Sequence, residues 1–291
     1  MSSVLVTGSS SGIGLATALV LGRAGHTVYA TMRNPSRATL LQATIRQEGL
    51  PVEIHEMNVD SDDSVTSAIS RILSTAGSLD ALVNNTGIAR NGSVEELSIE
   101  DFRAVMETNY FGALRCIHAV LPHMRERRSG CIVNLSSLAG RLAFSPLVAY
   151  SATKFALEAL SETLAQEVKP FDIHVAIVEP GVVDTAMARE MATVPETTLS
   201  ECIYPHPHRI AGLFRASAAT ATSPAVVAEA IRGIIENKSW RIRYPVGLDA
   251  KPFLEWRASM TDEEWVDWGA LEDDAWYQRV QNDFGLDARN A

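Results

Sequence analysis

The stretch Thr7-Gly8-Ser9-Ser10-Ser11-Gly12-Ile13-Gly14 follows an apolar run at residues 4–6 and precedes a helical pattern. We expect Gly8 to permit a tight turn, Gly12 to let the backbone approach a pyrophosphate, and Gly14 to allow close packing of helix and strand. The N–H groups that open the helix would then face an anion. Because this turn lies between a strand and a helix, it predicts a dinucleotide site rather than a merely structural turn.

Short apolar segments alternate with longer helical patterns through most of the chain. The predicted strands span residues 4–7, 27–31, 52–59, 81–84, 131–135 and 174–179, and several contain few polar residues. Strands buried on both faces of a parallel sheet have this composition. The helices between them include residues 14–24, 61–75, 99–127 and 150–169. This rhythm predicts an α/β fold, a doubly wound parallel sheet of the Rossmann type with helices on both faces.

The remaining segments suggest one domain with an extension. We assign residues 1–245 to a dinucleotide-binding and catalytic domain, in which residues 185–223 are irregular and interrupted by Pro195, Pro205 and Pro207. An irregular stretch of that length is typical of a lid or binding segment. Residues 246–291 form an acidic extension that contains four of the five tryptophans. We expect a helical segment whose tryptophan rings pack on the main domain or on a partner subunit.

Composition narrows the class of protein. Hydrophobic residues make up 46% of the 291 residues and charged residues 21%, as in soluble globular proteins. The formal net charge of -10 disfavours a general nucleic-acid partner, because phosphates repel an acidic surface. The three cysteines lie far apart, which predicts neither a disulfide framework nor a metal site. No signal peptide or membrane span is expected, so the protein should be cytoplasmic.

The end of the second predicted strand indicates which dinucleotide binds. Sites selective for NAD place an acidic residue there, whereas sites selective for NADP place a cation near the 2′-phosphate. This chain has no acid in residues 29–34, and Arg33 is a planar donor suited to phosphate. Ser11 adds a hydroxyl, so the sequence favours NADP(H). A simply exposed Arg33 at a strand end is the alternative.

Polar residues near the middle of the chain suggest proton transfer. Tyr150 and Lys154 are one turn apart on a predicted helix, so they share a face. A nearby ammonium lowers the pKa of a phenol from about 10, and such a phenol can exchange a proton with an alcohol or carbonyl. Lys154 is also placed to hold ribose hydroxyls. Ser137 follows a strand at the edge where open α/β sheets bind ligands, and we expect it to hydrogen-bond the same substrate oxygen.

Two further segments complete the candidate site. Asn84-Asn85-Thr86-Gly87 ends another strand and is expected to flank the cofactor. Asn109 lies within the long helix predicted at residues 99–127, where a buried amide needs hydrogen-bond partners. His206-Pro207-His208 offers two imidazoles but no third ligand, so no metal is predicted.

Over roughly residues 3–245 the chain resembles the short-chain dehydrogenase/reductase family. The motifs that agree in order and spacing are Thr7-Gly8-x-x-x-Gly12-x-Gly14, Asn84-Asn85-x-Gly87, Asn109, Ser137, Tyr150-x-x-x-Lys154 and Pro180-Gly181-x-x-x-Thr185. Within the family it looks most like the hydroxysteroid and retinol dehydrogenase branch, in residues 28–33, 154–158 and 242–244. The resemblance implies hydride transfer between NADP(H) and a carbonyl or secondary alcohol of a bulky or apolar substrate.

The resemblance also implies residue roles. Ser137 would orient the substrate oxygen, Tyr150 would be the acid/base, Lys154 would tune it and hold the ribose, and Asn109 would anchor a water in a proton relay. The implied cofactor contacts are Gly8, Ser10, Ser11, Gly12, Ile13, Gly14, Arg33, Asn58, Val59, Asn85, Thr86, Gly87, Tyr150, Lys154, Pro180, Gly181, Val183 and Thr185.

Two of these positions depart from the family. Thr86 stands where the family usually has Ala, which places an extra hydroxyl and methyl near the ribose. Asn58 stands where the family usually has Asp, although an amide oxygen can still accept a hydrogen bond from the adenine amino group.

Two other functions stay open. One is a non-catalytic regulatory protein that senses NADP(H), with the acidic extension as its partner surface. The other is an epimerase or dehydratase of the extended family, which is less favoured because its glycine pattern is usually spaced differently. In the preferred interpretation the partners are a small-molecule substrate and further copies of the chain. A homodimer or homotetramer would form through the helices at residues 99–127 and 150–169.

Overall fold

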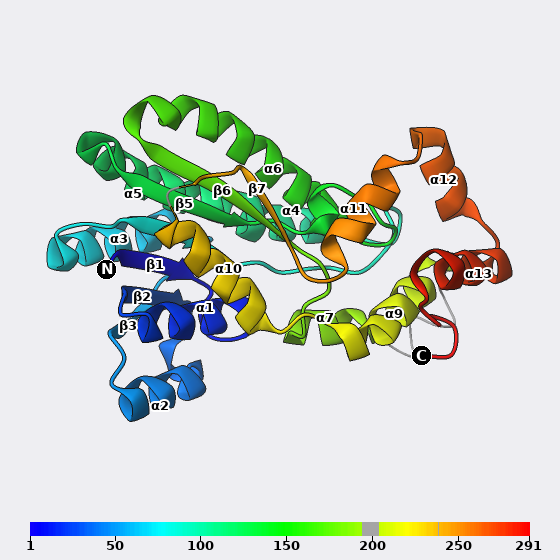
Figure 1. Cartoon of the computed structure of the whole chain (residues 1–291), viewed down its shortest axis with the longest axis horizontal. Coiled ribbons are helices and arrows are strands. Elements are labelled where there is room, and N and C mark those ends of the chain that lie inside the picture. Colours follow the sequence, from blue (N-terminus) through cyan, green and yellow to red (C-terminus); the bar gives the residue numbers. More distant parts are fainter. Residues whose placement is uncertain (194–203, 238) are drawn as a thin grey trace.

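The computed structural model describes residues 1–193, 204–237 and 239–291, and a parallel sheet forms its centre (Figure 1). Within these residues the sheet has seven strands in the order β3-β2-β1-β4-β5-β6-β7. The strands are β1 (Ser3–Thr7), β2 (Thr27–Met32), β3 (Val52–Glu56), β4 (Ala81–Asn84), β5 (Gly130–Leu135), β6 (Ile173–Pro180) and β7 (Arg243–Val246). The chain order reverses direction between β1 and β4, so the predicted doubly wound α/β fold is confirmed.

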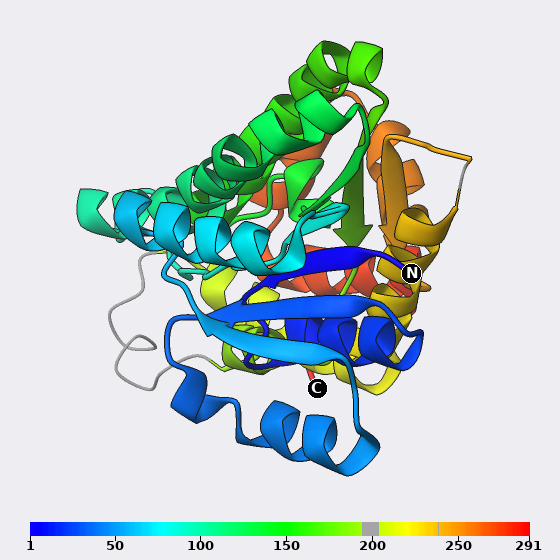
Figure 2. The ribbon, with the colours of Figure 1, turned by 90° about the vertical axis from the view of Figure 1, so that its left-hand side faces the viewer.

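Helices cover both faces of the sheet (Figure 2). On β1, Val4 and Val6 pack toward one face and Leu5 toward the other, and all three are fully buried. The first face is covered by α1 (Gly12–Arg23), α2 (Thr39–Glu48) and α10 (Pro224–Glu236). The second is covered by α3 (Asp62–Ala76), α5 (Gly112–Arg127) and α6 (Val148–Val168). Burial on both faces is why the inner strands, such as β1 and β4, are mostly apolar, whereas the edge strand β3 contains Glu53, His55 and Glu56.

The helix predicted at residues 99–127 is present but not uniform. It consists of α4 (Ile99–Met106), the π-helical turn η2 (Glu107–Phe111) and α5. A π turn inside an α-helix often marks a functional site, because the wider turn redirects its side chains. None of the helices in the described parts of the chain is long and apolar enough to cross a lipid bilayer.

Within the described residues, the segment predicted to be irregular at residues 185–223 contains the α-helices α7 (Ala186–Met191) and α9 (His206–Ser217) and the short 3-10 helix η5 (Ala218–Thr220). This part of the prediction was wrong. Thr185 begins α7, because its hydroxyl accepts a hydrogen bond from the Ala188 N–H at 3.2 Å. Pro207 lies in the first turn of α9, where a missing N–H costs no hydrogen bond. The rest of the predicted lid, residues 194–203 with Pro195, lies outside the described residues.

The C-terminal residues form α11 (Ala250–Ala258), α12 (Asp262–Ala270) and α13 (Asp273–Phe284), beyond one end of the sheet (Figure 1). Their tryptophans pack together, and the rings of Trp265 and Trp268 stack with centroids 5.3 Å apart. Both rings also contact Phe144 of the main body edge to face. The expected packing of this segment on the main domain is therefore confirmed for these rings.

Helix α9 is held between the C-terminal helices and the body. Arg209 is only 4% exposed and donates to Asp273 Oδ1 at 2.8 Å and to the Leu271 carbonyl at 2.7 Å. Its guanidinium also lies 5.6 Å from the centre of the Trp276 ring. One turn along, Gly212 touches the buried backbone of Ala288, so a Cβ on this glycine would lie 2.0 Å from the Ala288 carbonyl oxygen.

The close contact at Gly212 predicts that replacing this glycine by alanine destabilises the protein, whereas the same replacement at an uncrowded helical glycine does not. Gly212→Ala should lower the free energy of unfolding by about 1–3 kcal/mol, because backbone must move to admit the methyl group. Gly233→Ala in α10 is the matched control, since no atom lies within 4 Å of its Cβ position. There the better helix propensity of Ala should raise stability by up to about 1 kcal/mol. Urea unfolding of both variants checks this, and equal effects would contradict it.

Candidate active site

A cavity of about 390 Å³ opens at the carboxyl ends of β1, β4, β5 and β6. It is the edge at which open parallel sheets bind ligands, since the loops that follow neighbouring strands meet there. Of the predicted site residues, those that line the cavity are Gly8, Ser10, Ser11, Gly12, Ile13, Arg33, Val59, Asn85, Thr86, Gly87, Ser137, Tyr150, Lys154, Pro180, Gly181, Val183 and Thr185. Gly14, Asn58 and Asn109 lie behind this lining.

The glycine turn between β1 and α1 has the expected backbone geometry. Gly8 and Gly12 have positive φ values of 68° and 56°, which favour glycine. At Gly14 a Cβ would lie 2.3 Å from the Gly8 carbonyl oxygen and 2.4 Å from Asn85 Nδ2. The Asn85 amide in turn donates to the carbonyls of Thr7 and Gly8, at 2.9 and 3.2 Å. The residues present therefore fit a pyrophosphate held at the start of α1.

Thr86, one of the two residues that depart from the family pattern, is accommodated by the same turn. Its N–H donates to Thr7 Oγ1 at 3.1 Å, which fixes the chain after β4 against the end of β1. Its hydroxyl lies against Gly8, where a Cβ would be 3.0 Å from it. The absence of a side chain at Gly8 therefore provides the room that Thr86 needs.

The polar end of the cavity, which Ser11 and Arg33 line, lies beside the ends of β2 and β3. Arg33, directly after β2, is exposed and lines the cavity together with Ser11. Among ion pairs between described residues, none involves Arg33, so its guanidinium is available to a ligand. Asn58 is different, because its side-chain oxygen accepts from the Asp60 N–H at 3.3 Å and does not line the cavity. Val59 lines the cavity beside it, as predicted.

Tyr150, Lys154 and Ser137 come together at the middle of the cavity. Ser137 follows β5, whereas Tyr150 and Lys154 lie in the first two turns of α6. Ser137 and Tyr150 both line the cavity, and the Ser137 side chain lies close enough to Tyr150 to lower the pKa of its phenol. Lys154 Nζ lies 5.4 Å from the centre of the Tyr150 ring and donates to the Leu135 carbonyl at 2.6 Å. The geometric part of the sequence prediction is therefore met.

The electrostatic part differs from the prediction. Burial raises the pKa of Tyr150 to about 12, and the nearby Ser137 side chain only partly opposes this. Burial also lowers the pKa of Lys154 to about 8, against the attraction of Glu158 one turn further along α6. The expectation that Lys154 lowers the pKa of Tyr150 was wrong for the chain by itself. Its ammonium is engaged by the Leu135 carbonyl, and burial is the larger effect.

Asn109 lies in the π turn and is 1% exposed. Its Oδ1 accepts from the Ile88 N–H at 2.8 Å, and its Nδ2 donates to the Ile88 carbonyl at 2.9 Å and to Thr153 Oγ1 at 3.0 Å. The predicted need of this amide for partners is confirmed. The amide joins the loop after β4 to α6, one residue before Lys154.

In the segment after β6, one residue on the cavity wall, Val183, has a backbone N–H and a C=O that no described residue binds. The Val182 carbonyl accepts from the Thr222 N–H at 2.9 Å, and the Asp184 N–H donates to the Thr222 carbonyl at 3.0 Å. Val183 lines the cavity between them. In the described parts of the chain no hydrogen bond uses its N–H or C=O. This pair can bind a ligand amide.

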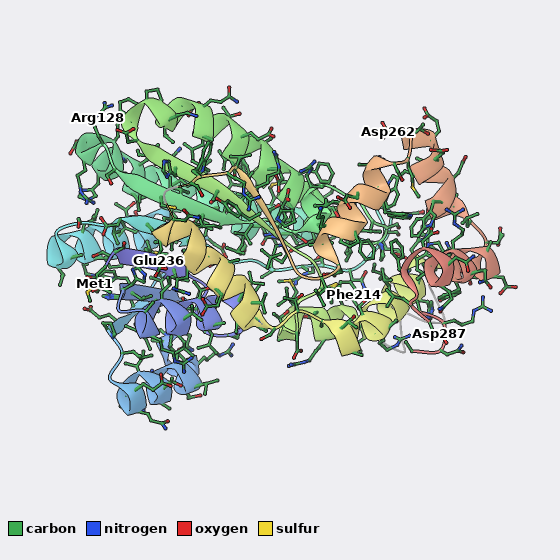
Figure 3. All side chains as sticks on the ribbon, viewed as in Figure 1. Met1, Arg128, Phe214, Glu236, Asp262 and Asp287 are labelled. Carbon is green, nitrogen blue, oxygen red and sulfur yellow. The ribbon has the colours of Figure 1, made fainter. Side chains whose placement is uncertain are left out.

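The other end of the cavity is apolar, and the sequence analysis missed most of it. Its walls include Phe144, Leu147, Met187, Met191, Ile210, Leu213, Phe214 and Phe253. Phe214 marks α9 in Figure 3, between the sheet and the C-terminal helices. The spacing of Ile210, Leu213, Phe214 and Ser217 is that of one helical face, a signal that could have identified α9. In the described residues no three His, Cys, Asp or Glu side chains gather as a metal site requires.

Comparison with known proteins agrees with this geometry. The model of the short chain dehydrogenase family matches residues 2–195. A 3-ketodihydrosphingosine reductase of Bacteroides thetaiotaomicron is 40% identical over 183 residues, which cover 62% of this chain and 64% of that protein. Human retinol dehydrogenase 8 is 39% identical over 208 residues, 67% of this chain and 66% of that protein. The alignments thus span slightly less than two thirds of these relatives.

A solved structure is similar over nearly the whole chain. A short-chain dehydrogenase from Streptomyces avermitilis has 34% sequence identity and a TM-score of 0.77, covering 92% of this chain and 96% of that one. Proteins of this kind are oxidoreductases that bind a nicotinamide cofactor, NAD or NADP. The chain belongs to the short-chain dehydrogenase/reductase family.

Proposed function

We propose that the protein is an NADP(H)-dependent oxidoreductase that acts on the carbonyl or secondary alcohol group of an apolar substrate. The observation that carries the proposal is that Ser137 and Tyr150 line the cavity as a neighbouring pair, with Lys154 beside the Tyr150 ring. The pair lies in the same cavity as the glycine turn, between its polar and apolar ends. A reacting group that enters from the apolar end therefore reaches a phenol and a hydroxyl next to the cofactor-binding wall.

The chain's own residues supply orientation and proton transfer. Ser137 holds the substrate oxygen, and Tyr150 donates a proton to it or accepts one from it. Lys154 holds the ribose. Asn109 fixes the loop after β4 against α6 through its hydrogen bonds with Ile88 and Thr153. The bound nicotinamide supplies the hydride chemistry. The predicted residues that line the cavity would hold this cofactor, and the N–H and C=O of Val183 would be available to its amide.

The protonation state of Tyr150 favours reduction. A phenol whose pKa is about 12 is neutral at physiological pH, because the pH lies well below that value. The neutral form can donate a proton to a carbonyl oxygen, whereas the reverse reaction needs the phenolate. This protonation state therefore suits proton donation to a carbonyl oxygen, and oxidation of an alcohol requires loss of the phenol proton first.

The apolar end of the cavity supports a bulky apolar substrate. Aromatic and aliphatic side chains from α9, α11 and the loop after β5 form its walls. Such a wall pays no desolvation cost for hydrocarbon but penalises a charged group. The names of the two relatives refer to a ketodihydrosphingosine and to retinol, compounds with a long hydrocarbon portion and a keto or hydroxyl group, which agrees with this assignment.

Exposed aromatic residues support the oligomer predicted from the sequence. Phe111 at the end of the π turn is 42% exposed, and Phe155 on α6 is 44% exposed. Both lie on the two long helices proposed to pair. Burial of these rings against another copy of the chain would remove apolar surface from water.

Tyr150→Phe is the direct test of the proposed acid/base. It should lower kcat by at least about 100-fold, since general acid–base catalysis contributes roughly that much or more. NADPH binding should persist, because the ring remains. Tyr277→Phe in α13, outside the cavity lining, is the control and should keep full activity. Turnover of an apolar ketone panel, followed by NADPH absorbance, measures both variants. Full activity of the Tyr150 variant would refute the role.

Arg33→Ala tests the cofactor preference. Loss of the guanidinium should raise KM for NADPH at least about tenfold, because a charge-assisted hydrogen bond to the 2′-phosphate is lost. KM for NADH, which lacks that phosphate, should change little. Arg37→Ala is the control, an exposed arginine outside the cavity. Equal changes for both cofactors would show that Arg33 does not contact the phosphate.

A further inference from the structure

Asp249 precedes α11 in a part of the chain that no motif singled out. As the N-cap residue it would be expected to accept a hydrogen bond from the first turn of its own helix. It makes no such bond. Its Oδ2 instead accepts from the backbone N–H of Val182 at 2.7 Å, across 67 residues of sequence. The carboxylate is therefore committed to the loop after β6 rather than to α11.

The carboxylate of Asp249 lies so close to the neighbouring backbone that no side chain would fit at the two glycines beside it. At Gly181 a Cβ would lie 2.0 Å from Asp249 Oδ1, so only glycine permits the contact. Gly247 has a φ of 116°, and a Cβ there would lie 2.8 Å from the same oxygen. Gly181, directly after β6, and Gly247, directly after β7, thus enclose the carboxylate group of Asp249.

The charge of Asp249 is not neutralised by protein. None of the ion pairs among the described residues involves it, and its neighbour Lys251 pairs with Glu255 instead. Asp249 lines the cavity together with Pro180, Gly181 and Val182. An uncompensated carboxylate therefore lies on the wall where the nicotinamide is proposed to bind.

We propose that Asp249 is a positioning residue of the nicotinamide loop, and that its charge favours binding of the oxidised cofactor over the reduced one. This inference rests on the proposed function. The oxidised nicotinamide ring carries a positive charge and the reduced ring carries none. A fixed carboxylate beside the ring attracts the first and not the second, and a partly buried site screens this attraction less than water does. Bound NADPH would then be a stronger hydride donor, in agreement with a neutral Tyr150.

The test compares dissociation constants of the purified full-length protein for NADP⁺ and NADPH, measured by calorimetry without substrate. Asp249→Asn keeps an oxygen that can accept from the Val182 N–H and removes only the charge. We expect its affinity for NADP⁺ to fall about fivefold or more relative to its affinity for NADPH. Asp267→Asn, an exposed residue of α12, removes the same charge outside the cavity and should leave the ratio unchanged.

Each outcome decides the proposal. A ratio unchanged in Asp249→Asn, or changed equally in Asp267→Asn, would overturn it. If the Asn variant does not fold, Asp249→Ser supplies a smaller neutral acceptor, and the same shift in ratio is expected. Wild-type protein that binds neither NADP(H) nor NAD(H) would refute the proposed function itself. Tight binding with an unaltered ratio would refute only the inference about Asp249.

Discussion

The structure depends on one close approach, at Gly14, where α1 passes so near the end of β1 that no side chain fits. The Gly8 carbonyl and the Asn85 amide occupy the space that a Cβ would need. Asn85 directly follows β4, and its amide donates to Thr7 at the end of β1 and to Gly8 in the turn before α1, so one side chain links the strands on either side of the reversal. The helix start and the crevice at the reversal are thereby brought to the same point. A dinucleotide site at this edge follows from that geometry.

The same edge receives its reactive groups from elements far apart in the sequence. Parallel pairing of β4, β5 and β6 brings Thr86, Ser137 and Val183 to one cavity. Asn109, in the π turn, then joins the loop after β4 to α6, because its Oδ1 accepts from the Ile88 N–H and its Nδ2 donates to Thr153 Oγ1. Side chains that touch a ligand are therefore supported by a buried hydrogen-bonded layer, as precise positioning requires.

The C-terminal helices contribute to the cavity in two ways. They hold α9 through the buried Arg209, so that Leu213 and Phe214 form a wall at the apolar end. They also bring Asp249 to the polar end, against Gly181. The family match ends at residue 195, so both contributions come from the part of the chain that lies beyond it. The apolar wall at α9 and the carboxylate at Gly181 are therefore supplied by residues that the family model does not cover.

The sequence by itself determined the sheet, the glycine turn and the spacing of Ser137, Tyr150 and Lys154, because local periodicity and short motifs express these directly. It also indicated that Asn109 needed partners. It could not show that burial outweighs Lys154 in setting the pKa of Tyr150, since the depth of a site depends on every element packed around it. Nor could it join Asp249 to Val182 or place α9 on the cavity. Those contacts span dozens of residues, and only the folded chain brings their atoms within hydrogen-bond distance.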